Sequence, residues 1–296
     1  MNHNNAASAA NKDQQIVIGF LLALLSGFSY STEAIAAKLL YDHGLSPLTV
    51  LTWRFLLAAF IFILWARQQL LSLHYNHYRL FVLLGLFQAV TVLFLFYAFM
   101  YIPAGLAAFL FYLYPTLVTL METIFLGIRP NSKRLLALFI TLIGLIIIAG
   151  PSITIGFSWP GLLYALAAAV GNAIFMLLSD RSLQDLPVAV VSAGTTTTAT
   201  LAFLAASALT HTSLSFPLEG TCIGLMLFLV LVPSVLALSC LLSAITYLGP
   251  GRTAIVATTE PFFTTLLGFI ILGEHLYVRE IIGGILIVLA VLIERS

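Results

Sequence analysis

Three charged residues lie inside apolar segments, where a charge is costly, and they are the first candidates for chemistry. Glu260 stands directly before Pro261, whereas Glu33 and Arg54 lie in two consecutive apolar segments. A charge at the centre of a bilayer costs about 2.5–3.5 kcal/mol on insertion scales, so such groups usually face a cavity or a partner. A buried acid of this kind can bind a cationic group or exchange a proton.

Each of these residues allows a functional and a structural interpretation. We expect Glu260 to line a central cavity; the alternative is a protonated acid that is hydrogen-bonded to a neighbouring helix. Glu33 and Arg54 fall at similar depth on adjacent antiparallel helices, so the sequence favours an ion pair between them. That pair would act either as an outer gate or as a static clamp between the two helices.

Several uncharged residues near mid-depth add to this candidate cavity. Tyrosine hydroxyls in apolar surroundings seek hydrogen-bond partners, and a proline within a helix frees a backbone carbonyl that must be buried in protein or face a wet cavity. Helix–helix bonds or packing kinks are the alternatives. The residues assigned to the cavity with Glu260 are Tyr97, Tyr112, Tyr114, Pro115, Asn172 and Pro261.

The motifs of common enzymes are missing from the sequence. There is no Walker-type phosphate loop and no CxxC or HExxH spacing, and the two cysteines, Cys222 and Cys240, are interpreted as packing residues. We therefore expect no catalytic residues, no cofactor and no metal site, and a membrane enzyme is disfavoured.

The elements that must position these residues are membrane helices. The chain has 296 residues, of which 61% are hydrophobic and only 8% charged, whereas soluble proteins carry about 25% charged residues. Unalternating apolar runs exclude a β-barrel and predict an all-α integral membrane protein with ten spans. These are 16–40, 47–66, 79–101, 104–127, 133–149, 159–179, 188–210, 220–247, 251–273 and 278–294.

The distribution of Lys and Arg predicts the orientation. Nine of the 12 basic residues fall in the tail and in alternate linkers, on one side, which the positive-inside rule assigns to the cytoplasm together with both termini. Glu122 would lie near that side and join an interfacial charge pair close to Arg129 and Lys133. The sequence thus predicts a multi-pass protein of a bacterial cytoplasmic (inner) membrane.

An internal repeat relates the two halves of the chain. With a shift of 146 residues, ten of the thirty positions in 98–127 and 244–273 are identical, among them Pro115/Pro261 and Gly127/Gly273. A weaker match, with a shift of 142, relates the first and sixth spans. We expect a disordered tail over 1–15 and two five-helix units, 16–150 and 151–296. Because five is odd, the units would be inverted in the membrane, as in many carriers.

These features together resemble the EamA-type ten-helix carriers of the drug/metabolite transporter superfamily. The resemblance is carried by Leu248–Arg252, Glu260–Pro261 and Leu272–Glu274, which Tyr114–Pro115 and Leu126–Gly127 echo in the first unit. Ile128 departs from the pattern where a glutamate is usual, and Glu33 where a small or neutral residue is commoner. The resemblance implies a central cavity between the units and alternating access.

The sequence therefore predicts a secondary active transporter that exports a small metabolite, an amino acid or similar. A non-transporting membrane sensor or scaffold and a facilitative channel are the alternatives. The expected partners are the small-molecule substrate and the lipid bilayer, with proton coupling through Glu260 as a further hypothesis. Nucleic acid is not expected, and the chain would act as a monomer or a homodimer.

Overall fold

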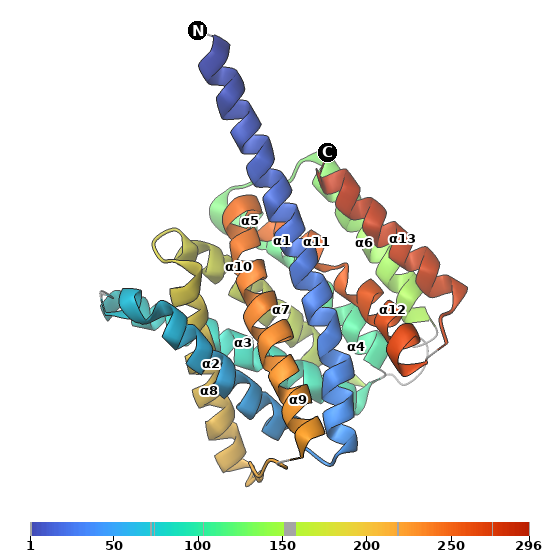
Figure 1. The fold of residues 1–296 in the computed structure, drawn as a ribbon. Helices are drawn as coiled ribbons and strands as arrows, with labels where there is room; N and C mark the ends of the chain where they lie inside the picture. The colour runs from blue at the N-terminus through green and yellow to red at the C-terminus, as the bar shows by residue number, and fades with distance from the viewer. Residues whose placement is uncertain are drawn as a thin grey trace.

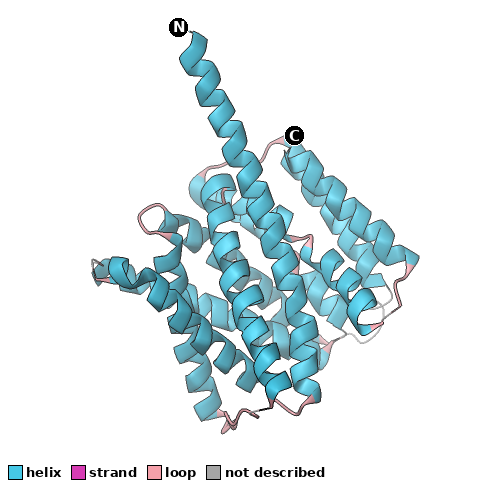
Figure 2. Ribbon diagram, viewed as in Figure 1, coloured by secondary structure: helices cyan, strands magenta, loops and turns pink. Residues whose placement is uncertain are grey.

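The computed structural model describes the backbone of residues 2–71, 73, 75–102, 104–150, 158–217, 219–273 and 275–295; side chains are described from residue 13, except those of 75, 76, 104 and 272 within these ranges. Within these ranges the chain is helical and contains no strand (Figure 2). The all-α prediction agrees with this. The disorder expected for the tail 1–15 stays a prediction, and Glu274 lies outside the described residues.

Among the described residues, six helices lie in the first half of the chain and eight helical segments in the second (Figure 1). The first half comprises α1 (Asn2–Asp42), α2 (Pro47–Leu70), α3 (Tyr75–Tyr101), α4 (Ala104–Phe111), α5 (Tyr114–Leu126) and α6 (Ser132–Ala149). The second comprises α7 (Trp159–Leu183), α8 (Val188–Leu209), α9 (Gly220–Leu229), the π-helical η2 (Val230–Leu236), α10 (Ala237–Leu248), α11 (Pro250–Ala257), α12 (Glu260–Leu272) and α13 (Val278–Arg295).

Among the described residues, nine stretches are long and apolar enough to cross a membrane. The expected spans 104–127 and 251–273 are each broken into two helices, and 220–247 contains the π-helical turn η2. The tenth expected span corresponds to α13, which has 18 residues and carries two charged residues near each end. The count of ten spans therefore stays a prediction.

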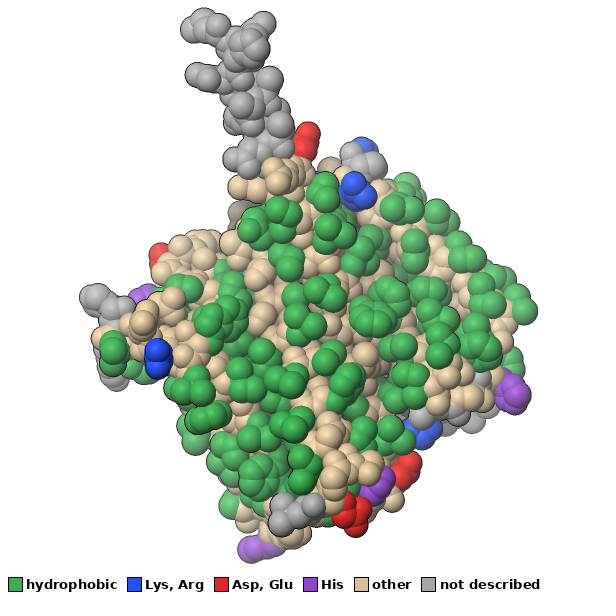
Figure 3. All heavy atoms as spheres, viewed as in Figure 1, with side chains coloured by type: hydrophobic (Ala, Val, Ile, Leu, Met, Phe, Trp, Pro, Cys, Tyr) green, Lys and Arg blue, Asp and Glu red, His purple; other side chains and the backbone are tan. Residues whose placement is uncertain are grey.

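The surface supports a lipid-facing role for the outer sides of these helices. Large apolar side chains are exposed along the helices, such as Phe60, Phe125 and Leu209. In the view of Figure 3, apolar side chains cover the middle of the molecule, while charged and histidine side chains gather toward its edges. This distribution is typical of a protein whose helices are surrounded by hydrocarbon.

The two halves of the chain pack against each other through equivalent pairs of helices. The first helix of one half lies against the third span of the other: α1 packs on α10, and α7 packs on α3. The glycine contacts are equivalent too, because a Cβ on Gly19 would meet Tyr247 and Leu248, whereas one on Gly161 would meet Tyr101 and Ile102.

Counterpart helices meet directly, and they run in opposite directions. Thr52 of α2 contacts Ser207 of α8, and Thr49, earlier on α2, contacts Ser213, just after the end of α8. The residue numbers therefore rise along one helix as they fall along the other. The helices α6 and α13 are also in contact and antiparallel. The α2–α8 and α6–α13 pairs lie at opposite edges of the molecule (Figure 1). Two units related by inversion require this antiparallel arrangement.

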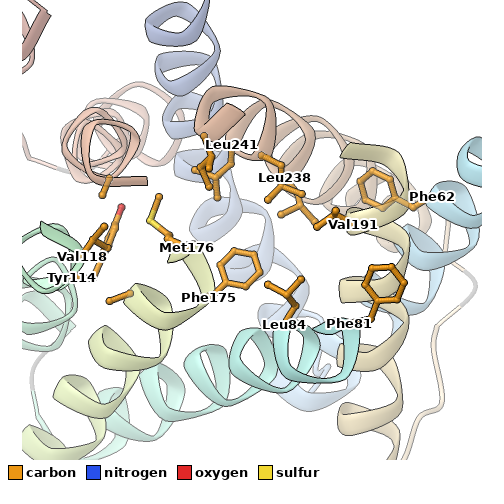
Figure 4. Close-up of a cluster of buried hydrophobic side chains, with 14 of the residues drawn as sticks. Phe62, Phe81, Leu84, Tyr114, Val118, Phe175, Met176, Val191, Leu238 and Leu241 are labelled. Carbon is orange, nitrogen blue, oxygen red and sulfur yellow. The ribbon is translucent and has the colours of Figure 1, made fainter. Parts of the chain in front are cut away.

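One apolar core joins the halves between these pairs. Figure 4 shows side chains from α2, α3, α7, α8 and α10 packed together, with Tyr114 and Val118 of α5 at one end of the cluster, near Met176. Phe62 and Phe175 are among its largest fully buried members. The core therefore extends to the point where α4 gives way to α5.

The α6–α13 contact depends on glycine, which gives the first prediction. A Cβ on Gly283 would lie 2.6 Å from the carbonyl oxygen of Gly144, whereas one on Gly224 of α9 would meet no atom within 4 Å. We expect Gly283→Ala to destabilise the protein by about 1–3 kcal/mol through overpacking, and the matched control Gly224→Ala to be neutral or slightly stabilising, because alanine favours a helix by up to about 1 kcal/mol. Thermal unfolding in detergent measures both; equal melting temperatures would contradict the close contact.

Candidate functional site

The two broken spans are interrupted at equivalent positions. The helix α4 ends at Phe111 and α5 starts at Tyr114, whereas α11 ends at Ala257 and α12 starts at Glu260; the second pair of residues equals the first plus 146. Pro115 and Pro261 lie in the first turn of the new helix in each case. A proline is well tolerated there, because the first N–H groups of a helix have no partner within it.

The prolines therefore start helices, whereas the sequence had suggested kinks inside continuous ones. Each half-helix also ends at an equivalent glycine, Gly127 after α5 and Gly273 after α12, with φ of 69° and 68°. Glycine adopts this left-handed conformation without the steric cost of a Cβ. The identical Pro and Gly pairs of the repeat thus mark the start and the end of two equivalent half-helices.

At the break before α12, two threonine hydroxyls donate hydrogen bonds to backbone carbonyls. Thr258 Oγ1 donates to the carbonyl of Ile255 at 2.5 Å, and Thr259 Oγ1 donates to that of Val256 at 2.9 Å. The helix α1 lies close to this break, since a Cβ on Gly27 would be 2.9 Å from Thr259 Oγ1 and 3.6 Å from the backbone nitrogen of Glu260. Only a residue without a side chain lets α1 approach so closely.

Glu260, the first residue of α12, faces residues of the first half of the chain. The Tyr112 hydroxyl and the side chains of Tyr30, Tyr114, Glu33 and Arg54 are close enough to its carboxylate to interact with it electrostatically. Tyr112 and Tyr114 are buried, with 7% and 4% of their surface exposed, whereas Glu260 is only partly buried. Tyr112 stands at one break and Glu260 at the other, so this interaction joins the two breaks.

Arg54 holds the second group of charged and polar residues together. Its Nη1 donates to Glu33 Oε1 in an ion pair, its Nε donates to Ser234 Oγ at 2.6 Å, and its Nη2 donates to the carbonyl of Pro233 at 3.3 Å. The Arg54 side chain is 6% exposed and that of Glu33 28% exposed. The guanidinium thus connects α1, α2 and η2.

The contact with η2 also repairs a helix defect. Pro233 has no N–H to donate to the carbonyl of Leu229, four residues earlier. Ser234 Oγ donates to that carbonyl at 2.8 Å and accepts from Arg54 Nε. A chain of hydrogen bonds therefore runs from the Glu33–Arg54 pair to the distorted backbone of the eighth expected span.

The structure brings together most, but not all, of the residues that the sequence assigned to this region. Glu260, Tyr112, Tyr114, Pro115 and Pro261 lie at the two breaks. Tyr97 instead packs against Tyr164 with the two rings tilted and their centroids 5.5 Å apart, in an aromatic group between α3 and α7. Asn172 lies half-buried on α7, and no hydrogen bond to Glu260 is described for it.

Two residues that the sequence reasoning missed belong to the site. Tyr30 lies on α1 three residues before Glu33, which places it on the same face of the helix, and it interacts electrostatically with both Glu33 and Glu260. Ser234 accepts from Arg54. The signals were the three-residue spacing of Tyr30 and the proline that precedes Ser234.

The expected partners of Glu122 were wrong. Its Oε2 accepts from Arg134 Nη1 at 2.7 Å, and its Oε1 accepts from the backbone N–H of Gly251 at 2.9 Å. Arg134 and Arg252 also contact Glu294 Oε1, at 3.5 and 3.1 Å. Arg129 is exposed. Arg134 is preferred because α6 starts at Ser132, after the N-cap Asn131, so that the first turn points its side chain back toward α5.

This charge network predicts a large effect of Arg134→Gln. The Glu122 and Glu294 side chains are 3% and 1% exposed, so the substitution leaves two buried carboxylates with weakened partners. Breaking a buried ion pair costs about 3–5 kcal/mol. We expect a strongly lowered melting temperature in detergent for Arg134→Gln and little change for the exposed control Arg129→Gln. Equal melting temperatures would show that the network contributes nothing to stability.

The geometry at Arg54 predicts that lysine cannot replace it. An ammonium group is a compact point charge, whereas the three donors of Arg54 reach Glu33, Ser234 and Pro233 in different directions. We expect Arg54→Lys to lower the melting temperature, because Ser234 or the Pro233 carbonyl loses a charged donor, at about 1.5–3 kcal/mol per bond. Lys replacing the exposed Arg67 is the matched control. If Arg54→Lys unfolds at the wild-type temperature, the positive charge alone matters.

Known proteins share both the sequence pattern and the fold. A curated relative, an uncharacterized transporter from Clostridium kluyveri, is 25% identical over 289 residues, which cover 94% of this chain and 93% of that protein. A solved structure, described only as the crystal structure of a protein, superposes with a TM-score of 0.77 at 20% identity and covers 93% of this chain and 95% of its own. The sequence model of the EamA-like transporter family matches twice, at 17–150 and at 159–294. The chain therefore belongs to the EamA-like transporter family and is a multi-pass membrane transporter.

Proposed function

We propose that this transporter is a secondary active carrier that exports a small metabolite with an amino group, such as an amino acid, by alternating access. The observation that carries the proposal is that Tyr112 at one helix break and Glu260 at the other lie close enough to interact electrostatically. A substrate bound at these two residues touches both inverted units at once. Movement of one unit against the other would then open the same site to either side in turn.

The chemistry around Glu260 favours an amine over an anion. A carboxylate attracts a cationic ammonium group, and the faces of Tyr30, Tyr112 and Tyr114 offer the aromatic surfaces that cations prefer. The positive charge of Arg54 is already engaged by Glu33, Ser234 and the Pro233 carbonyl. The net preference at this site is therefore for a positively charged or zwitterionic group.

Glu260 also supplies a simple means of energy coupling. In the proposed cycle the acid releases its proton when the ammonium group binds and takes up a proton when the substrate leaves. The Glu33–Arg54 pair lies on the side of this site toward the end of α1 and the start of α2, where it would act as part of the outer gate. In this proposal the protein lies in a bacterial inner membrane with ten spans and both termini in the cytoplasm.

Counterflow in proteoliposomes tests the proposal. Vesicles loaded with amino acids, nucleosides, sugars or organic cations would be given the labelled compound outside. We expect saturable exchange for amine-bearing compounds and none for sugars. Because a hydrogen bond to a charged group is worth about 1.5–3 kcal/mol, Glu260→Gln should weaken apparent affinity by roughly 10–100-fold and should remove the response to an imposed pH gradient.

A control variant and three outcomes of the counterflow assay decide the role of Glu260 and the class of protein. Asp185→Asn removes an exposed carboxylate in the turn between α7 and α8 and should leave exchange unchanged. If Glu260→Gln leaves both the rate and its pH dependence as in the wild type, the proposed role of Glu260 is wrong. Flux without saturation or exchange would favour a channel, and no flux of any compound by folded protein would favour a sensor.

A further inference from the structure

Three metal-ligating side chains from distant parts of the sequence lie together at the end of α1. They are His43, in the turn between α1 and α2, Glu219, directly before α9, and Cys222, in the first turn of α9. Their ligating nitrogen, oxygen and sulfur atoms all lie within 4.8 Å of one another. His43 and Glu219 are exposed, and Cys222 is buried beneath them.

The backbone around His43 holds its ring in a geometry suited to a ligand. The turn is closed by bonds from the Gly44 N–H to the Tyr41 carbonyl at 2.8 Å and from the Leu45 N–H to the Leu40 carbonyl at 3.3 Å. His43 Nδ1 lies 2.8 Å from the Leu39 carbonyl and donates to it. The tautomer with a proton on Nδ1 leaves Nε2 with a free lone pair, and histidine ligands of metals are commonly oriented in this way.

The other two groups are also available for a ligand. Glu219 is the N-cap residue of α9, yet its side chain makes no capping hydrogen bond there. Cys222 is a free thiol. A cavity of about 460 Å³, lined by His43 together with Ser46, Thr49 and Ser213, opens beside the cluster and gives access from solvent.

We propose that His43, Glu219 and Cys222 bind a thiophilic divalent cation of the Zn²⁺ class. Nitrogen, sulfur and carboxylate oxygen are the ligands that Zn²⁺ takes in proteins, and three protein ligands leave a fourth, tetrahedral position for water from the adjacent cavity. Mg²⁺ and Ca²⁺ are disfavoured because they require oxygen ligands. Binding replaces the thiol proton by the metal, so that one proton is released as the thiolate–metal bond forms.

The bound ion would tie the two inverted units together at one end. His43 belongs to the first unit, whereas Glu219 and Cys222 belong to the second, and α1 packs along both α9 and η2. Arg54 of α2 also contacts η2, through Ser234. An ion in this place restrains the separation of α1 from α9; that this restraint slows transport rests on the proposed function.

Cadmium titration of the purified full-length protein tests the site, since Cd²⁺ bound to thiolate gives an ultraviolet charge-transfer band. We expect one Cd²⁺ per chain and a band that Zn²⁺ removes by competition. Cys222→Ser should abolish the band. Cys240→Ser, the same change at the only other cysteine of the chain, should retain it. Since even a group that merely orients a ligand is worth 10–100-fold in affinity, His43→Ala and Glu219→Gln should each weaken binding by about tenfold or more.

Several results would overturn the proposal. These are the absence of a band in the wild type, its survival in Cys222→Ser, or unchanged affinity in both His43→Ala and Glu219→Gln. Since Cys222 is buried, its variant must be shown to be folded by thermal unfolding; if it is not, the two exposed variants decide. Zn²⁺ should also raise the melting temperature of the wild type but not of His43→Ala.

A further experiment distinguishes failure of the metal site from failure of the proposed transport function. Zn²⁺ should slow counterflow by the wild type and leave the His43→Ala rate unchanged. If Cd²⁺ binds as expected but no compound is exchanged by any variant, the metal site stands and the proposed function is wrong. If exchange is normal and Cd²⁺ does not bind, the proposed function stands and the metal site is wrong.

Discussion

A backbone N–H or carbonyl group that lies deep in an apolar protein must find its partner within the protein, and this constraint shapes the whole centre of the molecule. Three expected spans contain interruptions, at Tyr112–Leu113, at Thr258–Thr259 and in η2. Each interruption exposes carbonyls that water would otherwise satisfy. At Thr258–Thr259 and in η2, threonine and serine hydroxyls donate to backbone carbonyls, and Arg54 donates to the Pro233 carbonyl.

The repair of η2 shows how structure and proposed function become linked. Pro233 deprives the Leu229 carbonyl of a donor, Ser234 replaces that donor, and Arg54 donates to Ser234 in turn. Because Arg54 is nearly buried, it needs a carboxylate, which Glu33 provides. The distorted backbone at Pro233 is therefore linked, through Ser234 and Arg54, to Glu33 of the first unit.

The scaffold is symmetric, but its chemistry is not. The pairs of contacting helices, the two breaks and the two terminal glycines all obey the inverted relation. The three glutamates do not obey it. Glu260 corresponds to Tyr114, and Glu122 corresponds to Gly268. Glu33 corresponds to Phe175, which lies in the apolar core. The charge network around Arg134, which joins Glu122, Glu294 and Arg252, therefore does not follow the inverted relation.

Sequence reasoning recovers what periodicity and local spacing encode. The repeated Pro115/Pro261 pair located both breaks, and the matching depths of Glu33 and Arg54 suggested the ion pair that the structure contains. Ser234 and Tyr97 could not be placed in this way, because their neighbours come from helices whose rotation is set by packing. The partner of Glu122 was missed for a related reason: the first turn of α6, not distance along the chain, selects Arg134 over Arg129.

Access to the centre from each side of the membrane tests the account most directly. A single cysteine in place of Thr264, one turn beyond Glu260 on α12, would be introduced into protein lacking Cys222 and Cys240 and treated with charged, membrane-impermeant thiol reagents in vesicles of either orientation. Alternating access predicts labelling from both sides, with protection by the substrate from both. Labelling from one side alone under all conditions, whether substrate is present or absent, would contradict a shared central site between two moving units.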